Sequence, residues 1–73
     1  MPIETGDIVL DILNEWMWVV TSIEYSIQDN DHMYEIACLR DLSYTAIVNE
    51  RVITYMRADY IKRTKNVLAN KSQ

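Results

Sequence analysis

The 73-residue chain is poor in the residues that interrupt secondary structure and in those that form covalent or metal-bound cores. It contains one glycine, one proline, one cysteine, one histidine and no phenylalanine. A single cysteine excludes an intramolecular disulfide, which is typical of a reducing compartment. One cysteine and one histidine are too few for a structural zinc site, so we expect no metal and no cofactor.

The sequence also lacks targeting and membrane-spanning signals. Its first six residues contain neither the basic region nor the apolar region of a secretory signal. No apolar run approaches the roughly 20 residues that cross a bilayer. We therefore expect a cytoplasmic protein without membrane interactions, made of a single small domain over residues 1–66 and a frayed polar tail over residues 67–73.

Basic residues are absent from the first half of the chain. Residues 1–35 contain eight acidic side chains, whereas residues 36–73 contain all seven basic ones and three acidic ones. The two halves therefore carry net charges of −8 and +4, within a total of −4. Two interpretations follow: the halves attract one another within the fold, or the first half presents an acidic surface to a basic partner.

The longest run of strand-forming residues covers residues 15–28 and contains both tryptophans. Alternation gives it one apolar face and a second face that starts apolar and becomes polar at Ser22. The apolar face contains Met17, Val19, Thr21, Ile23, Tyr25 and Ile27, and the other begins with Trp16, Trp18 and Val20. We expect this segment to be the central strand of a small β domain.

Three further strands are predicted by alternation and by the turn residues that separate them. They cover residues 8–13, 33–40 and 45–52, with turns at 14–15, 28–32 and 41–43. The short first turn predicts an antiparallel hairpin, and the polar strand at 45–52 is expected at an edge. The C-terminal third has two interpretations. Either residues 55–59 form one helical turn before a closing strand at 60–64, or a helix covers much of residues 54–69.

The order of these pieces resembles the small SH3-like barrels, including the KOW-type ones. Gly6, Asp7, Ile8 and Val9 resemble their opening motif, and residues 18–23 resemble their long bent strand. Residues 34–39 resemble the next strand, and Val48, Asn49 and Glu50 resemble the edge-strand element. Small acidic barrels of this kind also look like accessory proteins of bacteriophages. The resemblance implies a binding module without an enzymatic activity.

We therefore expect a mostly β protein, a five-stranded SH3-like barrel with a short helical element near residues 54–60. The alternative is an α+β fold, in which a four-stranded antiparallel sheet is followed by a C-terminal helix.

The strongest candidate binding residues are the two tryptophans. Trp16 and Trp18 are two residues apart, so on a strand they point the same way and can form a platform for a partner. The alternative is that they fill the core. Acidic residues after the central strand complete the predicted partner-binding surface: Asp29, Asp31 and Glu35. A calcium loop here is excluded because Met33 and Tyr34 replace residues that such a loop requires.

A second candidate surface is the basic C-terminal third, where tyrosines alternate with cations. Its residues are Tyr55, Arg57, Tyr60, Lys62, Arg63 and Lys65. Such a cluster contacts phosphates and stacks on bases in nucleic-acid-binding proteins. An isoelectric point near 4.7 argues against this interpretation.

No pattern of catalytic residues is present. Cys38 lies between apolar neighbours in a predicted strand, where an unreactive buried thiol is expected. We therefore predict that the protein is not an enzyme. The leading hypothesis is a protein-protein interaction module with a basic partner, encoded by a phage as a modulator or inhibitor of a host protein in the host cytoplasm. The alternatives are a nucleic-acid-binding barrel and a structural or assembly subunit, as a monomer or a small homo-oligomer.

Overall fold

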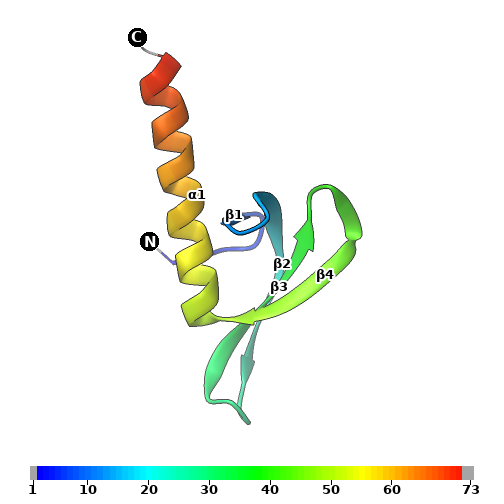
Figure 1. The fold of residues 1–73 in the computed structure, drawn as a ribbon. Helices are drawn as coiled ribbons and strands as arrows, with labels where there is room; N and C mark the ends of the chain where they lie inside the picture. Colours follow the sequence, from blue (N-terminus) through cyan, green and yellow to red (C-terminus); the bar gives the residue numbers. More distant parts are fainter. Residues whose placement is uncertain (1, 72–73) are drawn as a thin grey trace.

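A computed structural model describes residues 2–71 of the chain and the side chains of residues 2–67. Its elements are β1 (Ile8–Asp11), β2 (Trp16–Ser26), β3 (Asp31–Cys38), β4 (Asp41–Asn49) and α1 (Glu50–Lys71). The strands form one antiparallel sheet in the order β1-β2-β3-β4, so each strand pairs with its neighbour in the chain. Figure 1 shows α1 beside β1, with its C-terminal end reaching past the sheet.

The predicted five-stranded barrel is wrong, and the alternative of a four-stranded antiparallel sheet followed by a C-terminal helix is confirmed. Residues 60–64, the predicted closing strand, lie inside α1. Without that strand the sheet stays open, with β1 and β4 at its edges. A continuous helix is possible here because no glycine or proline interrupts the sequence after Gly6.

The helix begins earlier than predicted because Asn49 caps it. The Asn49 side-chain Oδ1 accepts a hydrogen bond of 3.0 Å from the backbone N–H of Val52, which has no partner within the helix. Glu50 follows in the first turn, where the helix dipole favours a negative charge. The predicted strand at 45–52 therefore ends at Asn49 as β4, at the edge of the sheet as expected.

A β-bulge at Thr21 changes which side chains of β2 face the core. Val20 pairs with Ile36 and Ser22 pairs with Glu35, so Thr21 is an extra residue without a partner. Its hydroxyl donates a hydrogen bond of 3.1 Å to the backbone oxygen of Glu35. The core face therefore contains even-numbered residues before the bulge and Ile23 after it. The prediction that Met17, Val19, Thr21, Ile23, Tyr25 and Ile27 share one face of the strand is therefore wrong.

The core lies between this face of the sheet and the first half of α1. Its buried residues are Val9, Trp18, Val20, Tyr34, Ile36, Cys38 and Ile53. Tyr34 also connects the sheet to the helix, because its hydroxyl donates a hydrogen bond of 3.1 Å to Glu50 Oε1. Burial raises the pKa of Tyr34 above its ordinary value of 10.0, and the hydrogen bond to Glu50 raises it further.

The connections between strands match the prediction at two places and differ at one. Asn14 and Glu15 lie in the β1-β2 loop, and residues 27–30 form the β2-β3 loop, where Asn30 adopts a positive φ of 52°. The predicted turn at 41–43 is wrong, since the chain reverses at residues 39–40 and β4 starts at Asp41. The helix continues through residue 66, where the sequence predicted the end of the domain, and residues 72–73 of the predicted tail lie outside the described residues.

Candidate functional site

An open apolar groove of about 360 Å³ runs between α1, β1 and the inner face of the sheet. It exists because α1 packs closely on β1 and makes only limited contact with β3 and β4 (Figure 1). Part of the inner face therefore remains uncovered. The groove is lined by Leu10, Asp11, Ile12 and Leu13 from β1 and its loop, by Trp18, Ile36, Ala46 and Val48 from the sheet, and by Val52, Met56 and Asp59 from α1.

The walls of the groove contain exposed aliphatic side chains from two separate segments. Leu13 is 91% exposed and Ile12 is 57% exposed in the β1-β2 loop, and Val52 on α1 is 42% exposed. Single exposed aliphatic residues are common on protein surfaces. Here they border one groove whose floor is also apolar, and such continuous apolar areas are typical of interaction sites.

An aromatic cluster lies next to the groove and shares Trp18 with it. The ring centroids of Trp16 and Trp18 are 6.4 Å apart, and Tyr44 lies 5.9 Å from Trp16 and 5.8 Å from Trp18. The Arg40 guanidinium carbon lies 5.6 Å from the centre of the Trp16 ring, at cation–π distance. Trp, Tyr and Arg are the residues that contribute most often to binding energy at protein interfaces.

Tyr44 reaches this cluster because the start of β4 bulges away from β3. Cys38 pairs with Asp41 and Ala37 pairs with Thr45, so the three residues between Asp41 and Thr45 have no partner on β3. Asp41 Oδ1 accepts hydrogen bonds from the Ser43 backbone N–H at 3.0 Å and from the Ser43 hydroxyl at 2.7 Å. These bonds, the side-chain one first, lower the pKa of Asp41 below its ordinary value of 3.8.

The two tryptophans differ in burial. Trp18 is 6% exposed and belongs to the core, whereas Trp16 is partly buried and packs against that core. The indole Nε1–H of Trp18 is shielded from solvent and has no hydrogen-bond acceptor among the described residues. A buried donor without an acceptor costs about 1–3 kcal/mol in the free energy of folding.

Both charged residues that line the groove are acidic. Asp11 accepts hydrogen bonds of 3.1 Å from the Leu13 backbone N–H and from Asn14 Nδ2, which fix its carboxylate within the β1-β2 loop. Asp59 lies on the opposite wall, on α1. No lysine or arginine is among the residues that line this groove in the described part of the chain. The groove therefore combines apolar walls with negative charge.

The predicted partner-binding residues do not form one surface. Trp16 and Trp18 lie at the start of β2, while Asp29 and Asp31 lie at the far end of the β2-β3 hairpin. Trp18 and Ser26 are separated by eight residues of strand, or about 26 Å at 3.3 Å per residue. Glu35 lies between them, with Oε1 3.1 Å from the Thr21 hydroxyl. Of these five residues only Trp18 lines the groove, and Trp16 lies beside it in the aromatic cluster.

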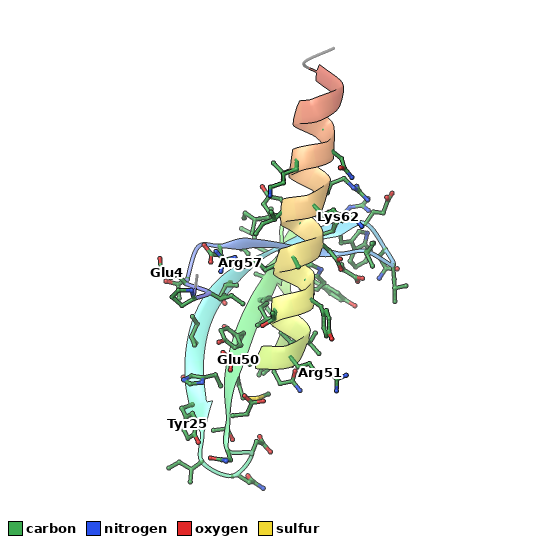
Figure 2. All side chains as sticks on the ribbon, turned by 90° about the vertical axis from the view of Figure 1, so that its left-hand side faces the viewer. Glu4, Tyr25, Glu50, Arg51, Arg57 and Lys62 are labelled. Carbon is green, nitrogen blue, oxygen red and sulfur yellow. The ribbon has the colours of Figure 1, made fainter. Side chains whose placement is uncertain are left out.

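The residues predicted for nucleic-acid binding all lie on α1, but they do not share a face. At about 100° per residue, the six positions are distributed around the whole circumference of the helix. Figure 2 shows Arg57 and Lys62 on different sides of α1. Arg63 Nη2 forms an ion pair of 2.9 Å with Glu15 Oε1, which connects the helix to the β1-β2 loop. This arrangement gives no single basic surface.

Other kinds of site are not apparent in the described residues. Cys38 is a buried free thiol at 2% exposure. Across residues 2–71, no three His, Cys, Asp or Glu side chains come together as a metal site. Within the same range, no helix is long and apolar enough to span a membrane.

Sequence reasoning identified the tryptophans but missed the residues that accompany them. Tyr44 and Arg40 reach the cluster only through the β3-β4 reversal and its bulge, for which the sequence gives no clear signal. Leu13 and Val52 could have been found from the sequence as exposed aliphatic residues, because Leu13 follows the end of a strand and Val52 lies near the start of a helix. Their proximity depends on how α1 packs on β1.

Comparison with known proteins gave no match: no family model, no curated protein and no solved structure matches this chain.

Proposed function

We propose that this protein is a non-enzymatic protein-binding module, and that its groove binds an apolar segment of a partner protein. The observation that carries the proposal is the open apolar groove that ends at the Trp16, Trp18 and Tyr44 cluster. Exposed apolar walls and clustered aromatic rings are the features of an interface centre.

The charge of the groove specifies the partner further. Asp11 and Asp59 line it, and no lysine or arginine does among the described residues. A partner segment that carries lysine or arginine beside its apolar residues would meet complementary charge. Complementary charges accelerate association at low ionic strength and are screened by salt. The proposal keeps the basic partner expected from the sequence and the tryptophans as the anchor, and it replaces Asp29, Asp31 and Glu35 with Asp11 and Asp59 as the acidic residues.

The proposal is tested with a pair of matched double variants. Leu13→Gln with Val52→Gln makes both walls of the groove polar, at positions that are 91% and 42% exposed. Ile27→Gln with Tyr55→Gln changes residues that are 89% and 63% exposed and lie outside the groove. Both pairs replace exposed apolar side chains, so neither is expected to disturb the core.

Each immobilised protein is incubated with a bacterial lysate, with and without nuclease, and the retained proteins are identified by mass spectrometry. We expect a protein that survives nuclease, is retained by the wild type and the Ile27/Tyr55 variant, and is lost with the Leu13/Val52 variant. Equal retention by both variants would contradict the groove as the binding site. Loss on nuclease treatment would favour the nucleic-acid alternative.

A narrower form of this proposal is that a phage encodes this chain and that the chain modulates or inhibits a protein of the host. It is supported by the small acidic domain and by the absence of a catalytic residue pattern in the sequence. It requires that binding change the activity of the retained protein, so an activity assay of that protein with and without the chain tests it.

A further inference from the structure

Strand β4 leaves one edge of the sheet open. The strand order places β4 at an edge, and seven of its nine residues are exposed while the other two are half-buried. In an edge strand, every second residue directs its backbone N–H and C=O away from the sheet. The opposite edge, β1, has only four residues and lies against α1, so it is covered.

β4 lacks most of the features that prevent edge strands from pairing. Between Leu42 and Asn49 it contains no charged residue and no proline, whereas lysine, proline and inward-pointing charges commonly protect such edges. The bulge protects only the first part of the strand, because pairing with β3 is regular from Thr45 to Asn49. Ile47, in the middle of this regular part, is 65% exposed.

The regular part of β4 is complementary to itself. Residues directly opposite in an antiparallel pair lie on the same face of the sheet. A two-fold axis at Ile47 therefore places Ile47 against Ile47 of the second copy. It also places Thr45 against Asn49 and Ala46 against Val48. This register brings the exposed isoleucines together, pairs two polar residues and joins two half-buried apolar ones, with no like charges facing each other.

We propose that two copies of this chain associate through antiparallel pairing of their β4 strands, with the two-fold axis at Ile47, into one eight-stranded sheet. Such an interface uses the same patch on both copies, as most closed dimers do. It lies on the edge and the outer face, since Ile47 borders Ser22, Glu24, Met33 and Glu35 there. It shares Ala46 and Val48 with the lining of the groove, but it does not depend on the proposed function.

The test is the mass in solution of the wild type and of charged variants, measured by sedimentation equilibrium over a range of concentrations. We expect the wild type to reach twice its chain mass of 8.6 kDa. Ile47→Glu is expected to raise the dissociation constant about tenfold or more, because two carboxylates meet at the axis beside Glu24 and Glu35. Ile27→Glu, at an isoleucine of the hairpin tip that is 89% exposed, should leave it unchanged.

A mixing experiment distinguishes this register from other contacts. Ile47→Glu is expected to be monomeric, and an equimolar mixture with Ile47→Lys is expected to form a heterodimer, because opposite charges then face each other at the axis. Circular dichroism confirms that each variant is folded. A wild type that stays at 8.6 kDa at millimolar concentration would overturn the proposal. A dimer that Ile47→Glu does not weaken, or a mixture that stays monomeric, would overturn it equally.

Discussion

Replacing Trp18 tests the core and the unsatisfied indole N–H together. Trp18→Ala removes a ring that is 6% exposed and packed in the core, so we expect a loss of about 3–5 kcal/mol in the free energy of unfolding. A domain of 73 residues has a total stability of about 4–11 kcal/mol at 0.05–0.15 kcal/mol per residue. The alanine variant should therefore lose a large part of the total stability.

Trp18→Phe keeps an aromatic ring in the core and removes the Nε1–H. The buried donor has no acceptor among the described residues, so its removal recovers about 1–3 kcal/mol. This gain offsets much of the loss from the smaller ring, and we expect Trp18→Phe to lose less than about 2 kcal/mol. Urea denaturation followed by circular dichroism measures both variants. If Trp18→Phe were as destabilising as Trp18→Ala, the N–H would have a partner and the reasoning would be refuted.

Two further predictions concern the helix and its connection to the sheet. Asn49→Ala should lose about 1 kcal/mol in urea denaturation because the Val52 N–H loses its cap, and Asn49→Asp should retain most of the stability; equal losses would exclude capping. The raised pKa of Tyr34 means that the folded state favours the neutral phenol. The contribution of this phenol to the free energy of unfolding is therefore complete below pH 10 and is lost as pH rises through the folded-state pKa. Stability measured from pH 8 to about pH 11 should therefore fall more steeply for the wild type than for Tyr34→Phe, and parallel curves would show that Tyr34 does not contribute.

The order and direction of the strands could be predicted from the sequence because the signals are local. Alternation of apolar residues and short connections determine that neighbouring strands pair in an antiparallel sheet. The edge position predicted for residues 45–52 is also correct for β4, although Glu50 and Arg51, which made that segment polar, belong to α1. The helix carried a local signal too, in Asn49 followed by Glu50, but Val48 and Val52 fit both a strand and a helix and concealed the boundary.

The core face of β2 could not be predicted because it depends on a bulge. Alternation assumes a regular strand, and one extra residue moves every following side chain to the other face. The bulge at Thr21 is accompanied by a hydrogen bond to Glu35, fourteen residues away. The same limit applies to the candidate site: Trp16 and Trp18 were visible as a pair, but Tyr44 and Leu13 join them only through packing between segments.

The most direct test of the proposed function is a titration of the purified partner from the lysate experiment into the protein, followed by tryptophan fluorescence. Trp16 and Trp18 are the only tryptophans in the chain; both belong to the aromatic cluster, and Trp18 also lines the groove. With a partner that lacks tryptophan, the fluorescence signal therefore comes from this site alone. We expect a saturable change whose dissociation constant rises at least about tenfold in the Leu13→Gln, Val52→Gln variant. It should stay unchanged in the Ile27→Gln, Tyr55→Gln variant. Binding of equal affinity to both variants would contradict the groove as the protein-binding site.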